Sequence, residues 1–515
     1  IDSADGAAVR IAMTVAAPGR SSGILEKVTS EQARDDGENE VTLSRGGGVL
    51  AANLQIGADL SSVCGLRAND EMSNRGFCLF GAGFIVTTED ATHLLSASDA
   101  SAERVIWKYR NGKDLTNRPR DVMLIDAYPF GVNELQTMHP AVYQHLLVHV
   151  KPERDHNARA CRRNLWWAFG EPNKKLREQL AGLPRYIATV ETSKHRFFTF
   201  LDREILPDNM LIAIASDDAF ILGVLSSQVH VTWALAAGGR LGMGNDPRYN
   251  KSRCFEPFPF PALEEGPLKQ RIRDLGERLD AHRKRQQELY PDLTLTGIYN
   301  VLEKLRSGAA LDAKDKAVHD RGLVSVLKQL HDDLDAAVLE AYGWQDLKWG
   351  VGGPPAFSSQ HGQAARAPLD AEGLEQLILS RLVALNHEHA AEEKRGLIRW
   401  LRPDYQSPST ATSDGHRPPL QSEIEGIDTS DHSTSKIQNS KFPDWPAELP
   451  AQVAALRKLL PTIGQAPGTV TEETSASSVE PLAERLSACF GRKSRKRVDQ
   501  ITAILDTLKS LGLVN

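Results

Sequence analysis

The sequence predicts a mixed α/β domain, followed by an α-helical domain and a small helical tail. Between residues 50 and 260, short apolar runs alternate with turn residues, as is typical of strands mixed with helices. From Leu268 onward, dense charge is combined with apolar residues spaced by three and four, the pattern of amphipathic helices. With 515 residues, the chain is long enough for about three domains.

Each element of the α/β region follows from a local apolar pattern. We expect strands in the runs at 77–87, 105–109, 121–127, 185–191, 196–201 and 210–216. We expect helices at 140–155, 174–183 and 219–237. The helical domain is predicted from the segments 268–292, 297–308, 323–344 and 374–401, and a Gly and Pro cluster at 350–355 interrupts it.

The two ends of the chain differ from its middle. Residues 9–15 form a short β-like run that begins abruptly, as if it closed a larger sheet. Residues 403–443 are rich in Ser, Thr, Asp and Pro, which predicts a flexible linker. The tail, 444–515, ends in two amphipathic helices around a basic run at 491–497 and resembles part of a helix-turn-helix bundle. We therefore expect domains at 1–45, 46–262, 263–402, 403–443 and 444–515.

Bulk composition excludes several classes of protein. The chain is 41% hydrophobic and 25% charged, with no run that approaches a membrane span and no secretory signal. Its five cysteines are scattered and lack metal-binding spacing, which favours a reducing cytoplasm. The absence of an initiating Met indicates a processed, trimmed or incomplete chain. A net charge of −6 argues against a simple basic DNA-coating protein.

Positive charge is nevertheless concentrated in one part of the chain. Between Arg104 and Arg196 there are 17 Lys and Arg residues against 9 Asp and Glu residues. Such an excess favours nucleic acid, but a solvated surface with helical charge pairs has the same composition. Charge alone leaves both interpretations open.

The stretch from Asp217 to Pro261 carries the clearest functional pattern. An apolar, helix-capable segment leads into a Gly-rich loop, and the aromatic-proline run 255–261 follows. Cations meet DNA phosphates, and Arg and Asn read base edges, so the loop predicts DNA contact. The alternative is a surface loop anchored by the aromatic run. The candidate contacts are Arg240, Asn245, Arg248, Tyr249, Asn250, Lys251 and Arg253.

A second cluster lies between Trp107 and Thr116. Cations and an aromatic residue are packed into a predicted turn here, which favours a phosphate-binding edge; an exposed hairpin is the alternative. The candidates in this cluster are Lys108, Arg110, Asn111 and Lys113.

Other motifs predict no chemistry. The glycines at 81–83 precede a strand-like run, whereas a cofactor loop follows a strand and opens a helix, so we expect a turn or bulge. Glu392 and Lys394 match half of a nuclease motif but lie in a helical segment, and His387 and His389 lie on different helix faces. Neither a convincing S-adenosylmethionine loop nor the Asn-Pro-Pro-aromatic motif that clamps a target amine is present.

Several long blocks resemble one family. The segments 183–198, 206–241, 247–261 and 299–344 are similar to the C-terminal half of large bacterial adenine-specific DNA methyltransferases, including single-chain type II restriction-modification enzymes. Residues 5–15 resemble the strand that closes the methyltransferase sheet of that family. The resemblance covers most of residues 5–401 and is weaker over the linker and the tail.

The resemblance implies a target-recognition role for residues 46–262, supported by the helical domain, with 1–45 a methyltransferase remnant. It implies double-stranded DNA and a missing N-terminal methyltransferase part, in cis or in trans, as partners. S-adenosylmethionine would serve the intact enzyme and not this chain alone, which carries no catalytic residue of the family and is expected to be inactive. The alternatives are a non-enzymatic specificity subunit and an inactive remnant. Further candidate DNA contacts are Thr192, Lys194 and His195.

Overall fold

The computed structural model describes residues 13–15, 22–33, 39–50, 54, 56–96, 104–241, 246–347, 371–407 and 501–502. The chain divides into two units, residues 1–420 and 421–515. The fold described below belongs to the first unit. Most of the predicted linker and nearly all of the predicted helix-turn-helix tail lie outside the described residues.

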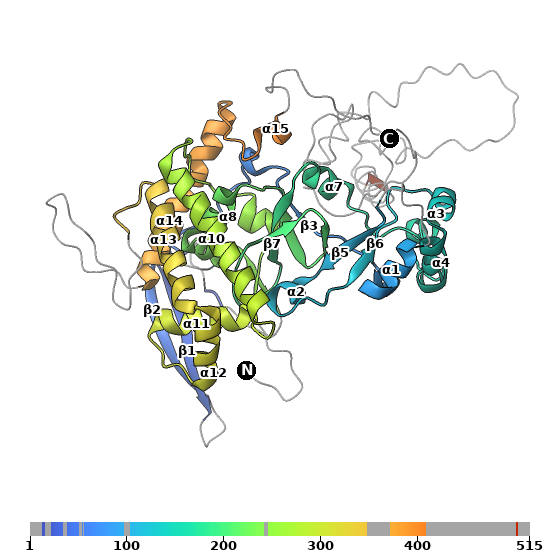
Figure 1. Cartoon of the computed structure of the whole chain (residues 1–515). Coiled ribbons are helices and arrows are strands. Elements are labelled where there is room, and N and C mark those ends of the chain that lie inside the picture. The colour runs from blue at the N-terminus through green and yellow to red at the C-terminus, as the bar shows by residue number, and fades with distance from the viewer. Residues whose placement is uncertain are drawn as a thin grey trace, which may run out of the picture. The chain divides into compact units, whose positions relative to one another are not determined.

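Two four-stranded sheets form the centre of the α/β region (Figure 1). The first is antiparallel throughout, in the order β3-β10-β7-β8. The apolar runs predict three of its strands: β7 (Arg185–Val190), β8 (Thr199–Asp202) and β10 (Leu211–Ile214). They do not predict β3 (Ser73–Arg75), which lies before the run at 77–87.

The second sheet has the order β4-β6-β5-β9, and its β5–β9 pair is parallel. Its strands are β4 (Ile85–Val86), β5 (Ile106–Arg110), β6 (Met123–Ile125) and β9 (Ile205–Pro207). The sequence does not predict β9, which is only three residues long. The side chain of Tyr109 joins the two sheets, because its hydroxyl donates to Asp208 in the turn between β9 and β10 over 2.6 Å.

Short helices surround these sheets, and α1, α3 and α4 gather at one end of the region (Figure 1). The predicted helix at 140–155 is divided at Val150, beside Pro152, which has no N–H to continue the hydrogen-bond ladder. The helices are α1 (Thr88–Ser96), α2 (Gly112–Thr116), α3 (Val132–Met138), α4 (Pro140–His149), α5 (Lys151–Asp155), α6 (Ala160–Asn164) and α7 (Lys174–Leu180).

The predicted apolar helix at 219–237 is two helices, α8 (Ala219–Ser226) and α9 (Gln228–Ala237). They are bent by 63° at Ser227, and the buried carboxylate of Asp335 accepts from the first N–H of α9 at 2.6 Å. Within the described residues, no single helix is long and apolar enough to cross a membrane, and only this bent pair taken together meets those criteria.

The helical region packs directly on the sheets. Helix α10 lies against α8 and α13, and Gly276 allows the close approach because the backbone of Ala219 occupies the space of a side chain. Buried residues of both predicted domains form one continuous core. The helices are α10 (Pro267–Leu289), α11 (Leu295–Ser307), α12 (Ala313–Gly322), α13 (Val324–Ala341), α14 (Ala371–Lys394) and α15 (Pro403–Gln406).

Helix α14 reaches back to the beginning of the α/β region. The amide of Asn386 donates to the carbonyls of Cys64 and Pro257, at 2.8 and 2.7 Å. The carboxylate of Glu393 accepts from the backbone N–H groups of Arg67 and Ala68, both at 2.8 Å. These contacts join α14 to the start of the α/β region, and Glu392–Lys394 end a helix, whereas the nuclease motif places its carboxylates on strands.

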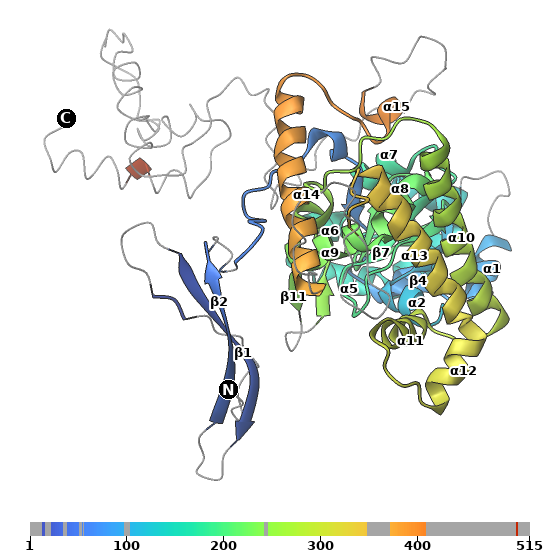
Figure 2. The same cartoon turned by 90° about the vertical axis from the view of Figure 1, so that its left-hand side faces the viewer.

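The N-terminal part contains a hairpin that the polar, Gly-rich sequence does not predict. Strands β1 (Gly23–Ala33) and β2 (Asn39–Gly48) pair antiparallel, with Val28 opposite Leu43 (Figure 2). Ile24, Val28, Val41 and Leu43 are between 47% and 60% exposed, although the register places them on one face of the ribbon. Of the predicted strand at 9–15, only residues 13–15 are described, and they have no regular structure.

Candidate nucleic-acid interface

Four loops meet at one edge of the two sheets, and they carry most of the predicted contact residues. The carbonyl of Arg110 accepts from Asp208 N at 2.9 Å, which joins the loop after β5 to the loop after β9. Met210 accepts from Glu191 N at 2.8 Å, and a backbone bridge pairs Thr192 with Arg248. Segments 110–113, 191–195, 208–210 and 246–251 therefore form one surface, which we call the loop edge.

The Gly-rich loop contributes a small two-stranded ribbon to this edge. Strands β11 (Gly239–Leu241) and β12 (Asp246–Arg248) pair antiparallel, with Arg240 opposite Pro247. Gly238 precedes the ribbon, and the backbone of Arg248 fills the position that a side chain there would need. Asn245 lies outside the described residues.

Arg248 is held by a buried acid that the sequence does not single out. Its Nε and Nη2 donate to Oε1 of Glu191 at 2.8 and 2.6 Å. The Glu191 side chain is only 4% exposed, whereas that of Arg248 is 36% exposed. The guanidinium is therefore fixed on one side and open to solvent on the other.

Tyr249 lies in the core and not on the surface, with an exposed fraction of 1%. Its hydroxyl forms a 3.0 Å hydrogen bond with Nε2 of His230, which is also buried. Burial raises the pKa of Tyr249 well above its usual value, and burial together with the charge of Arg196 lowers the pKa of His230 to about 3. Tyr249 is therefore a core residue, and the prediction that it contacts DNA is wrong.

The remaining residues of this segment form a turn of π-helix, η3 (Lys251–Phe255), with Asn250 at its N-terminus. Lys251 pairs with Glu256 at 3.0 Å, and Arg253 is exposed. The following phenylalanines at 255, 258 and 260 are buried, and the amide of Asn69 donates to three carbonyls of this run. The aromatic run is thus an anchor, as the sequence predicts.

The second predicted cluster lies at the end of β5 and in α2. Asn111 is the N-cap of α2 and forms a capping box with Asp114, so its side chain is used in the fold. Arg110 is 18% exposed and donates to Asp121 at 3.0 Å. Lys108 is 54% exposed and lies 3.8 Å from Glu204. Lys113 is exposed, so this cluster presents Lys108 and Lys113 to solvent.

The third group joins the loop edge to the helical region. Lys194 Nζ and His195 Nε2 both donate to Oδ1 of Asn300 on α11, at 2.7 and 2.8 Å. Burial lowers the pKa of His195. The Thr192 hydroxyl is buried, with no hydrogen-bond partner among the described residues. Only Lys194 of the three, 57% exposed, is available to a large ligand.

Sequence reasoning missed three residues that shape this edge. Glu191 holds Arg248, and it also pairs with Arg75 at 3.2 Å. Buried Arg196 donates to the carbonyls of Val190 and Pro247, and burial lowers its pKa to about 10. For Glu191, the sequence offers one signal: it ends the apolar strand predicted at 185–191 and directly precedes the candidate contacts.

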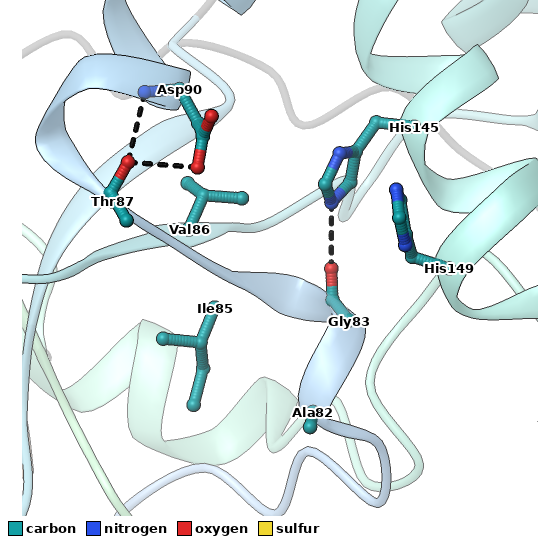
Figure 3. Close-up of a pocket in the computed structure, with 8 residues that line it drawn as sticks. All are labelled: Ala82, Gly83, Ile85, Val86, Thr87, Asp90, His145 and His149. Carbon is teal, nitrogen blue, oxygen red and sulfur yellow. Dashed lines mark hydrogen bonds between the residues drawn. The ribbon is translucent and has the colours of Figure 1, made fainter.

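The glycines at 81–83 do not form a cofactor cradle. They lead into a 3₁₀ turn and the short strand β4, and the backbone of His149 occupies the space beside Gly83. A pocket of about 580 Å³ lies here, with the rings of His145 and His149 tilted by 37° to each other on one side and Asp90 on the other (Figure 3). His145 donates to Gly83 O, and Asp90 accepts from Thr87, so these groups are already used. The described residues hold no group of three or more His, Cys, Asp or Glu side chains that could bind a metal ion.

Comparison with known proteins gives matches to a family model, to a curated protein and to solved structures. Residues 66–262 match the family model described as "MmeI, target recognition domain". Over 75 residues, the chain is 32% identical to DNA methyltransferase A of Bacillus subtilis (strain 168), covering 14% of this chain and 8% of that protein. The type IIL restriction-modification enzyme MmeI, solved in complex with DNA, matches with a TM-score of 0.49 and 17% identity over 73% of this chain and 42% of that chain.

The similarity to a DNA methyltransferase is therefore confined to a stretch of 75 residues, and the family match is confined to one domain of the chain. Residues 66–262 are similar to the target recognition domain of MmeI, which confirms the resemblance predicted from the sequence. The chain spans less than half the length of either protein that it matches.

Proposed function

We propose that residues 66–262 recognise a short double-stranded DNA site on behalf of an adenine-N6 methyltransferase of a restriction-modification system. The observation that carries the proposal is the family match over these residues, which include the whole loop edge. The helical region, 267–347 and 371–394, shares a core with this domain and supports it. The methyltransferase part would be supplied by another segment of polypeptide, in cis or in trans.

The residues that remain accessible on the loop edge suit this role. Arg248, Lys113 and Lys194 present cations from three different loops, and Arg253 follows on η3. Cations spaced along one edge contact the phosphates and base edges of a duplex. Arg240 and Asn245 stay in the proposed set, while Asn111, whose side chain caps α2, is a supporting residue.

The hairpin β1–β2 supports the proposal of a missing partner. A two-stranded hairpin is marginally stable in water by itself. One face of it exposes Ile24, Val28, Val41 and Leu43, together with the ion pair between Glu26 and Arg45. We propose that this face packs against the methyltransferase part, of which residues 1–45 are a remnant.

A salt-dependent gel shift with duplex DNA tests DNA recognition. We expect binding that weakens steeply as salt rises, because phosphate contacts release counterions. Lack of binding at low salt would exclude DNA recognition and leave a scaffold role. The purified chain alone is expected to transfer no methyl group from S-adenosylmethionine to DNA, and turnover would reveal a cofactor site outside the described residues.

The coding region upstream of Ile1 separates the two forms of the proposal. An in-frame Asn-Pro-Pro-aromatic motif there would make the chain the recognition part of one polypeptide. A separate gene that carries this motif would make the chain a specificity subunit that works in trans.

A further inference from the structure

The carboxylate of Glu191 connects two arginines that are distant in the sequence. Its Oε1 accepts from Nε and Nη2 of Arg248, at 2.8 and 2.6 Å. Its Oε2 accepts from Nη2 of Arg75, at 3.2 Å. Because the Glu191 side chain is 4% exposed, its charge is compensated by these two partners and not by water.

The backbone around this carboxylate is fixed as well. Glu191 N donates to Met210 O at 2.8 Å, and Glu191 O accepts from Tyr249 N at 2.7 Å. The buried side chain of Arg196 donates to two further carbonyls: that of Val190, which precedes Glu191, and that of Pro247, which precedes Arg248. The strand end that carries Glu191 and the ribbon that carries Arg248 therefore keep one relative position.

Arg75 and Arg248 use the same edge of the guanidinium group for their hydrogen bonds within the protein. Each uses the edge of its guanidinium formed by Nε and Nη2: Arg248 toward Glu191, and Arg75 toward Asn209 O at 3.2 Å and Glu191. Among the described residues, neither Nη1 has a hydrogen-bond partner. The side chains are 46% and 36% exposed for Arg75 and Arg248. The outer edge of each guanidinium, Nη1 with the second N–H of Nη2, is thus open.

Such an outer edge presents two parallel N–H donors to a ligand. The two acceptors of a guanine in the major groove, O6 and N7, match this geometry, and a phosphate oxygen pair also matches it. A base contact and a phosphate contact differ in one measurable respect. Loss of a base contact lowers sequence specificity, whereas loss of a phosphate contact weakens binding to all sequences equally.

We propose that Glu191 is a positioning residue that holds Arg75 and Arg248 as a pair of guanine-reading side chains on the loop edge. This inference rests on the proposed DNA-recognition function. It adds Arg75 to the recognition surface and assigns sequence choice to an acid that itself does not touch DNA.

The test uses the full chain and a random-sequence duplex library. The wild-type chain first selects its preferred duplex, and the affinity for this duplex is compared with that for a scrambled one. We expect Glu191→Gln to lower this ratio at least about tenfold, with scrambled-duplex binding and its salt dependence unchanged. The neutral amide keeps the shape of the side chain but turns an N–H donor toward one of the arginines.

Two further variants make the result specific. Glu204→Gln is the matched control, since Glu204 is an exposed acid that pairs with Arg104 and Lys108 in the same domain, and it should leave the ratio unchanged. Adding Glu191→Gln to Arg248→Ala and Arg75→Ala together should have little further effect, because Glu191 acts only through these arginines.

Three outcomes would overturn the inference. Glu191→Gln could behave like the Glu204 control, or it could weaken both duplexes equally, as a phosphate clamp would. If Glu191→Gln does not fold, the variant Arg75→Ala tests the inference instead. This variant should fold, because Arg75 lies on an edge strand and Glu191 still pairs with Arg248. That variant should lose preference for one G·C pair of the selected site, and an unchanged preference contradicts the inference. A wild-type chain that binds no duplex would instead refute the proposed function.

Discussion

The two predicted contact segments, 108–113 and 248–253, have similar sequences and similar local structures. They differ in the acidic residue that pairs with the arginine of each segment. Each contains a buried tyrosine with a bonded hydroxyl: Tyr109 with Asp208, and Tyr249 with His230. In each, an asparagine begins a short helical turn. The difference lies in the acid that binds the arginine.

Arg248 pairs with a carboxylate that is 4% exposed, whereas Arg110 pairs with Asp121, which is 77% exposed. A buried acid holds an arginine in one geometry, while an exposed ion pair contributes little and exchanges with water. Interleaved cations and aromatic residues therefore do not by themselves identify base-reading residues. In the proposed function, the buried partner fixes Arg248 well enough to discriminate between bases, whereas Arg110 lacks such a partner.

The largest expected effect concerns Tyr249. Tyr249→Ala should lower the free energy of unfolding by about 3–5 kcal/mol, because it leaves a cavity and an unpaired His230 in the core. Chemical denaturation measures this value, and Lys113→Ala, at an exposed position, is the control. A loss below about 1 kcal/mol would show that Tyr249 is not a core residue.

The hydrogen-bond partner of Tyr249, His230, should make stability depend on pH. The pKa of His230 is about 3 in the folded state, below its usual value of 6.5. As the pH falls below 6.5, the unfolded chain takes up a proton that the folded chain refuses, so stability is lost down to a pH of about 3. By about pH 5 this group should cost roughly 2 kcal/mol.

The measurement compares the wild-type chain with His230→Asn at several pH values. The variant is expected to be less stable at neutral pH but to lose less stability on acidification. The other titrating groups are common to both proteins, so their contributions to the two pH profiles cancel. Parallel pH profiles of the two proteins would contradict a buried, neutral His230.

The two arginines should differ in DNA binding. Arg248→Ala should weaken binding to the preferred duplex by about 1–3 kcal/mol, and Lys251→Ala should do the same if it contacts a base edge. Arg110→Ala should cost less than about 1 kcal/mol, since its ion pair is exposed. Titrations of labelled duplex measure all three, and unchanged affinity in both the Arg248 and the Lys251 variants would remove this loop from the interface.

The smallest effect is expected at Lys113. Lys113→Ala should weaken binding to preferred and scrambled duplexes equally and reduce the salt slope by about 1, as for one lost phosphate contact. Binding measured across a salt series gives this slope. A change in sequence preference would instead assign Lys113 to base reading.

Much of the fold follows from local sequence patterns. The apolar runs predict β5, β6, β7 and β10, and the three-and-four spacing predicts α10, α11, α13 and α14. Features that depend on distant partners were not predictable. The break between α8 and α9 depends on Asp335, which is 107 residues away from Gln228.

The candidate site shows the same limit. The sequence places cations near the loop edge, but it does not distinguish Tyr249, which is buried, from Arg253, which is exposed. It also does not reveal Glu191, because the ion pair with Arg248 joins residues 57 positions apart. Only the packing of β7, β10 and the β11–β12 ribbon brings the acid and the arginine together.

The most direct test of the central claim is a competition between the duplex that the chain selects from a random library and a scrambled duplex of equal length. The account predicts a clear preference for the selected duplex, lost in Arg248→Ala and retained in Arg110→Ala. Equal affinity of the wild-type chain for both duplexes would contradict the claim that this domain reads DNA sequence.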